Sequence, residues 1–167
     1  MTMPPPLRKL GLLAHIVASV GWLGAVLTSL ALGVVGLAAT DGELVRAAYL
    51  VMASLGWAIL VPLSVLSLAT GLVQALGTRW GLLRHYWVII KLVMNLFATA
   101  ILLLYMQTLA AIEATARAWT GGDAALLRNP SPALHSAGAL ILLLIAAVLS
   151  VYKPKGQTRH GQQRALP

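Results

Sequence analysis

The sequence predicts an all-α integral membrane protein, a four-helix bundle with both termini in the cytoplasm. Hydrophobic residues make up 59% of the 167 residues and charged residues only 10%, which leaves too little polar surface for a soluble domain of this length. The apolar residues gather in four runs, and most of the basic residues stand near the ends of those runs, as membrane topology requires. We therefore expect a multi-pass protein of the cell inner membrane whose main partner is the lipid bilayer.

Composition also excludes several classes of function. The formal net charge is +8, but the basic residues do not alternate with aromatic residues on a soluble face, so no nucleic-acid partner is expected. The chain has no cysteine, which excludes disulfides, thiolate-ligated clusters and covalently attached c-type haem. Carboxylates are absent from the apolar cores, so carboxylate proton relays and hard-cation sites lack their usual groups.

Four stretches meet the requirement of roughly 20 predominantly apolar residues for a spanning helix: 10–39, 44–76, 86–114 and 134–152. The first three exceed that minimum, which predicts tilt or protrusion beyond the bilayer. The polar turn between the first two runs offers Thr40 or Asp41 as a helix N-cap. Pro62 interrupts the second run and is expected to kink that helix rather than end it, because neighbouring helices can satisfy the freed carbonyl.

The remaining segments are predicted to be connections and a tail. Residues 77–85 form a short basic connection, and residues 118–133 form a loop with room for one short turn at 124–127. Residues 1–152 thus make one four-span domain. Residues 153–167 make a basic cytoplasmic tail that we expect to be disordered.

The distribution of charge predicts the orientation. The N-terminus, the second connection and the tail carry eight basic residues: Arg8, Lys9, Arg79, Arg84, Lys153, Lys155, Arg159 and Arg164. The other two connections carry only three basic residues, together with all four acids: Arg46, Arg117, Arg128, Asp41, Glu43, Glu113 and Asp123. The positive-inside rule then places both termini in the cytoplasm.

Away from the ends of the apolar runs there are two candidate ionisable residues, His15 in the first run and Lys91 in the third. Such a side chain costs free energy unless it is paired or ligated, so each is a candidate functional residue. Both sit roughly 7–9 Å inside the cytoplasmic edge, at about 1.5 Å of helix per residue. The matching depth predicts a common site. Alternatively, Lys91 could snorkel to the headgroups and His15 could simply hydrogen-bond to another helix.

Each of these residues belongs to a polar stripe with a tryptophan. Helical spacing places His15 on one face with Ser19 and Trp22, and Lys91 on one face with Trp87 and Asn95. The two stripes predict a cavity between the first and third spans. Polar side chains of the second run could line the same cavity or bond back to their own helix: Ser64, Ser67, Thr70 and Gln74. His85, at the membrane edge, is expected on the surface, and His135 begins the fourth run near the opposite face.

Small residues recur along the first run at three- and four-residue steps: Gly11, Ala14, Ala18, Gly21 and Ala25, followed by Gly33 and Gly36. Such a stripe lets another backbone approach closely. We expect it to serve packing inside the bundle, and a homo-oligomer formed through it is the alternative.

Several motifs between residues 10 and 154 resemble a family of small bacterial four-helix membrane proteins of unknown function. The resemblance rests on His15 followed by Trp22-Leu23-Gly24, on Leu60-Val61-Pro62-Leu63-Ser64 with Thr70-Gly71, on the connection from Leu76 to Trp87 with Leu92 beyond it, and on Lys153-Pro154. That family implies a membrane fold and no particular activity.

A more distant resemblance is to the HemJ-type membrane protoporphyrinogen oxidases and the copper-resistance D proteins, which share a four-helix core. In the HemJ-type enzymes a first-helix His followed by Trp seven residues later, and a later Trp-x-x-x-Lys, are associated with haem b. The pairs His15–Trp22 and Trp87–Lys91 match those spacings. The chain lacks the Leu-Pro-Arg segment of those enzymes and has Ile89 where they carry a second His, so the resemblance implies the haem site more than the oxidation of porphyrinogen.

We therefore expect a haem b protein engaged in electron transfer or a porphyrin-linked oxidation. His15 would be an axial ligand and Lys91 the second ligand or a propionate partner. Trp22 and Trp87 would flank the macrocycle, and Asn95 would hydrogen-bond in the pocket beside Ser19. The alternative is a non-catalytic membrane subunit or small-molecule permease without a cofactor. Copper transport is a weaker reading because the methionines are dispersed.

Overall fold

The computed structural model describes residues 3–78 and 80–163, and in this part of the chain the structure is helical, without strands. The helices are α1 (Pro5–Ala38), α2 (Gly42–Leu55), the π-helical turn η1 (Gly56–Leu60), α3 (Val61–Gly77), α4 (Tyr86–Ala118), the 3₁₀ turn η2 (Ala124–Leu126), α5 (Ser131–Tyr152) and α6 (Arg159–Gln163). The four predicted runs are confirmed as helices, each extended at one or both ends beyond its apolar stretch.

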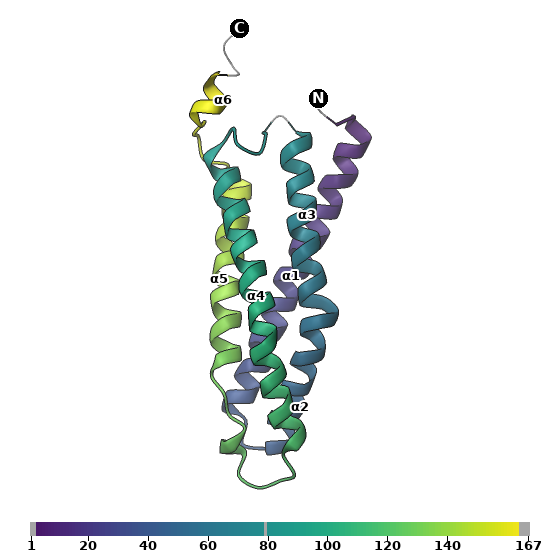
Figure 1. The fold of residues 1–167 in the computed structure, drawn as a ribbon, viewed down its shortest axis with the longest axis vertical. Helices are drawn as coiled ribbons and strands as arrows, with labels where there is room; N and C mark the ends of the chain where they lie inside the picture. The colour runs from purple at the N-terminus through teal and green to yellow at the C-terminus, as the bar shows by residue number, and fades with distance from the viewer. Residues whose placement is uncertain (1–2, 79, 164–167) are drawn as a thin grey trace.

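Four long helical segments lie side by side along the molecule (Figure 1). Helix α1 packs against α3 on one side and α5 on the other, while α4 packs against α2, α3 and α5. Helices α1 and α4 do not make extensive close backbone contact, so they face each other diagonally across the core. Both run away from the end of the molecule that holds the two termini (Figure 1), and are therefore parallel.

The segment from Gly42 to Gly77 is one continuous apolar span, as the sequence predicts, although Pro62 lies within it. The π-helical turn η1 comes directly before this proline. A proline ring clashes with the carbonyl four residues earlier, here that of Ala58, and a π-type turn moves that carbonyl out of register. Gly56 permits close contact with α4, because a Cβ atom there would meet Met106 Cε at 2.7 Å.

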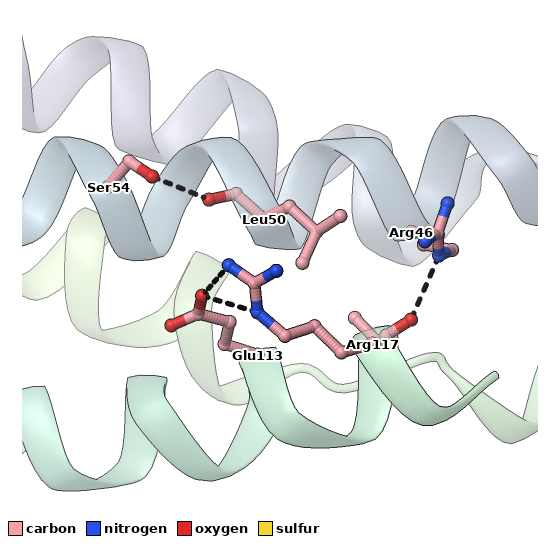
Figure 2. A network of polar contacts seen from close by, with 6 residues as sticks. Arg46, Leu50, Ser54, Glu113 and Arg117 are labelled. Atoms are coloured by element: carbon pink, nitrogen blue, oxygen red, sulfur yellow. Dashed lines mark hydrogen bonds and ion pairs between the residues drawn. The ribbon is translucent and has the colours of Figure 1, made fainter.

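The connections at the end opposite the termini are held by caps and short-range polar contacts. Asp41 is the N-cap of α2 and accepts a hydrogen bond from the Glu43 amide at 2.9 Å. Asp123 caps η2 in the same way, so the predicted short turn is confirmed. Figure 2 shows Arg46 reaching the carbonyl of Ala116 at 3.0 Å. The Arg46 contact ties the start of α2 to the end of α4.

The small-residue stripe of α1 is used for packing within the chain. A Cβ atom at Gly33 would lie 2.8 Å from the backbone nitrogen of Ala133 in α5, and one at Gly36 would lie 2.6 Å from the ring of Tyr49 in α2. Gly21 faces only the flexible end of Leu63, at 3.3 Å. The stripe therefore packs against α2, α3 and α5, and at Gly33 it lies directly against the backbone of α5.

The expectation of a disordered tail is wrong for its described part. Helix α6 follows α5, and residues 156–158 pair with the connection before α4. The amide of Tyr86 donates to Gly156 O, the amide of Thr158 donates to Arg84 O at 3.0 Å, and the Thr158 hydroxyl donates to Leu83 O at 2.5 Å. Backbone pairing orders this segment despite its polar composition. Arg164, counted with the tail, lies outside the described residues, as does Arg79.

The outward faces of the four long segments carry large apolar side chains such as Leu13, Val17, Leu104 and Ile141, all exposed. A contiguous apolar surface of this extent is unfavourable in water and marks contact with lipid or protein. The four segments Pro5–Ala38, Gly42–Gly77, Tyr86–Ala118 and Ser131–Tyr152 are each long and apolar enough to cross a membrane. The chain is thus a multi-pass membrane protein.

Candidate functional site

The two predicted stripes both face the interior. His15 and Ser19 are half-buried on α1, and Trp22 is 2% exposed. On α4, Lys91 and Asn95 are half-buried and Trp87 is 9% exposed.

The stripes also share a level along the molecule. Trp22 and Ala98 pack in one buried cluster, and His15 and Lys91 each come seven residues before these two residues. Because α1 and α4 are parallel, His15 and Lys91 lie at a similar depth along the bundle.

The hydrogen bonds around His15 define its tautomer. His15 Nδ1 lies 3.1 Å from Thr70 Oγ1, and Thr70 Oγ1 lies 2.6 Å from the carbonyl of Leu66. A hydroxyl has one proton, and a carbonyl can only accept, so the Thr70 proton goes to Leu66 and Thr70 accepts from His15 Nδ1–H. In the neutral ring the lone pair is then on Nε2, where it can accept a proton or ligate a metal.

Contacts from α3 hold this ring in place. Ser19 Oγ and Ser67 Oγ are 2.9 Å apart one turn further along α1. A Cβ atom at Gly71 would meet His15 Cε1 at 3.1 Å, so the ring packs directly on the α3 backbone. Of the other predicted polar residues of this span, Ser64 bonds back to Val61 O, and Gln74 Nε2 donates to Arg8 O. The neighbours of His15 thus come from the second span.

Lys91 has a partner that the sequence analysis did not identify. Its Nζ donates to Ser150 Oγ on α5, and Ser150 donates in turn to the carbonyl of Ala146 at 2.9 Å. Ser150 is a hydroxyl in the last turn of an otherwise apolar run, on the side where Lys91 enters the membrane. The shared depth of Ser150 and Lys91 is the feature of the sequence from which this pair could have been predicted.

Among the described residues, five buried polar side-chain atoms have no hydrogen-bond partner. One is Trp119 Nε1, just after α4, and the other four lie within the helices: Trp22 Nε1, Ser29 Oγ, Asn95 Oδ1 and Thr99 Oγ1. These four come from α1 and α4, the two diagonal helices. Burial of a polar atom without a hydrogen-bond partner is unfavourable. Trp22 Nε1 is a hydrogen-bond donor, and Asn95 Oδ1 is an acceptor. The interior between α1 and α4, from about one to several turns beyond His15, therefore offers polar atoms to a group that is not part of the chain.

An open apolar groove of about 320 Å³ runs between α1 and α3 and is lined by Leu10, Leu13, Ala14, Val17, Ala18, Leu63, Leu66 and Thr70. The predicted cavity was between the first and third spans, so this groove lies on a different side of α1. It reaches Thr70, the partner of His15. An apolar ligand could thus approach the histidine from the lipid.

Of the other two described histidine rings, His85 adjoins the candidate site through Trp87, and His135 lies apart from it. His85 Nδ1 lies 2.7 Å from the carbonyl of Trp80, and the His85 ring is half-buried beside Trp80 and Trp87 rather than on the open surface. His135 stacks on Tyr105 with ring centroids 4.1 Å apart. Within the described residues no three His, Asp or Glu side chains cluster.

Comparisons with protein-family models, curated proteins and solved structures found no match.

Proposed function

We propose that this chain is an inner-membrane protein with cytoplasmic termini that binds haem b, with His15 as an axial ligand. The observation that supports this most directly is the hydrogen bond from His15 Nδ1 to Thr70. Metal-ligating histidines characteristically donate their other ring N–H to a neighbouring acceptor, which fixes the tautomer and ring orientation. Here Thr70 is that acceptor, and its own proton is already committed.

The residues present fit a haem better than an isolated metal ion. A macrocycle brings four nitrogen donors of its own, so one histidine from the chain is sufficient for five-coordinate iron. Bound haem would supply an iron that exchanges one electron between its ferrous and ferric forms. Trp22, Trp87 and the apolar side chains around them would exclude water, and Asn95 Oδ1 and Trp22 Nε1 lack partners within the protein and could hydrogen-bond to a ligand.

Lys91 has two possible roles, as second ligand or as partner of a propionate. Its amine donates a hydrogen bond to Ser150 in the last turn of α5. A neutral amine could ligate iron, whereas an ammonium would pair with a carboxylate. Both roles require movement of Nζ away from Ser150, and electron transfer or a porphyrin-linked oxidation would follow from the haem chemistry in either case.

Spectra of three variants test the assignment. His15→Ala should lose most bound haem, because the iron loses a direct bond. His135→Ala is the matched control and should keep the wild-type Soret band, since His135 stacks on Tyr105 near the opposite end. Lys91→Ala should change the spin state if Lys91 ligates iron, and should lower haem retention alone if it pairs with a propionate. A coloured His15→Ala protein with an unchanged spectrum would refute the ligand assignment.

A second candidate, a permease for small neutral polar molecules, is favoured by the four unpartnered polar atoms on α1 and α4. Donors and acceptors without partners could bind a passing polar molecule in turn. Osmotic swelling of proteoliposomes in glycerol or urea tests this function. A colourless protein whose swelling rate falls in Thr99→Val would favour the permease, and a rate equal to that of empty liposomes would exclude these two solutes.

A further inference from the structure

The end of the molecule that holds both termini carries basic side chains from three segments: Arg8, Lys9, Arg84, Lys153, Lys155 and Arg159. All four acidic residues belong to the connections at the opposite end or the helix ends beside them. Both ion pairs among the described residues, Arg46–Glu43 and Arg117–Glu113, also lie there. Within the described structure the basic end has no acidic partner of its own.

Backbone pairing holds the tail cations beside the connection before α4. Lys153 adopts the left-handed conformation with φ of 44° and ends α5, and the chain then pairs with residues 83–86 through Gly156 and Thr158. Because these contacts use main-chain groups and the Thr158 hydroxyl, the side chains of Lys155 and Arg159 stay exposed. They are thereby brought close to Arg84, whose carbonyl accepts from Thr158.

Aromatic rings mark this surface as lying at the level of the lipid headgroups. Trp80 packs edge to face against His85 at 5.2 Å and against Trp87 at 5.5 Å between centroids, and Lys153 Nζ lies 5.5 Å from the Trp80 ring centroid. Tryptophans are enriched at the boundary between lipid and water. The neighbouring Val151 and Tyr152 are 76% and 79% exposed, so an apolar surface adjoins the cations.

We propose that the basic end binds the phosphate groups of anionic lipids through four of its cations, Arg84, Lys153, Lys155 and Arg159. A lipid satisfies both features of the surface, since its phosphate complements cations that lack acidic partners and its acyl chains cover the apolar side chains beside them. Clusters of basic residues next to a membrane span bind anionic headgroups in this way. The inference depends on the proposed membrane embedding and orientation, but not on haem.

The test is native mass spectrometry of the full chain in detergent with phosphatidylglycerol or phosphatidylcholine. Phosphatidylglycerol should bind at least fivefold more than phosphatidylcholine, and the triple variant Lys153→Gln, Lys155→Gln, Arg159→Gln should lose most of that preference. The matched control, Arg46→Gln with Arg117→Gln and Arg128→Gln, removes the same charge from the opposite end and should keep the preference within about twofold. Equal loss in both triple variants would show a net-charge effect and overturn the proposal.

Two further experiments test whether the ordered tail and the lipid itself are needed for phosphatidylglycerol binding. Thr158→Val removes the hydroxyl bonded to Leu83 without changing charge, and should weaken phosphatidylglycerol binding by loosening the tail. Inorganic phosphate at a hundredfold molar excess should not displace the lipid, and displacement would mean a free-anion site instead. Colourless protein that binds phosphatidylglycerol selectively would refute haem binding and leave this inference standing.

Discussion

The close approach of α1 to α5 at Gly33 gives a quantitative prediction about stability. A Cβ atom at Gly33 would lie 2.8 Å from the Ala133 backbone nitrogen, well short of ordinary van der Waals contact, which begins near 3.4 Å. The obstacle is backbone, so no side chain can rotate away, and the start of α5 must move by about half an ångström. Overpacking of this kind typically costs about 1–3 kcal/mol.

Gly24 provides the matched control on the same helix, because a Cβ atom there would have nothing within 4 Å. Gly→Ala in a helix gains about 1 kcal/mol of propensity in water, and this gain is common to both positions. The free energy of unfolding of Gly33→Ala should therefore be about 1–3 kcal/mol below that of Gly24→Ala. Reversible unfolding in mixed micelles measures the difference. Equal stabilities would show that α1 and α5 are not in close contact at Gly33.

Further predictions concern orientation, the buried tyrosine, the surface ion pair and the ligand shell. Reporter fusions at the C-terminus and in the 119–123 loop should report opposite faces of the membrane, with the C-terminal fusion cytoplasmic; a periplasmic tail would overturn the orientation. Tyr49→Phe should lower the unfolding free energy by about 1–3 kcal/mol, since it leaves the Asn129 amide without its acceptor; an unchanged midpoint would contradict that contact. Glu113→Gln should cost less than about 1 kcal/mol, because the Arg117 partner is exposed. Thr70→Val should weaken haem retention about 10-fold or more, while Thr70→Ser preserves it. Equal haem retention in the two variants would show that the Thr70 hydroxyl does not support the His15 ligand.

The sequence is sufficient to predict the helices because apolar run length is a local property. The four spans and the caps at Asp41 and Asp123 follow from residues within a few positions of one another. Pro62 was expected to kink its span, and the structure has a π-helical turn directly before the proline. At the start of this turn Gly56 lies in close contact with Met106 of α4. That contact is not encoded locally.

The candidate site was predictable in its depth and faces but not in its partners. Helical spacing gives which residues share a face with His15 and Lys91, and both stripes do point inward. Which helices are adjacent depends on the packing of all four, and here α1 and α4 are diagonal, so Thr70 and Ser150 on the intervening helices receive the hydrogen bonds. The order in the tail was missed because it depends on backbone pairing with residues 83–86, which composition does not reveal.

The central claim, that the chain binds haem b through His15, is tested most directly by the haem content and absorption spectrum of the wild-type protein purified after expression with ample haem supply. We predict about one non-covalent haem per chain and a Soret band that shifts on reduction with dithionite. A correctly folded, colourless protein that takes up no haem when it is added would contradict the claim.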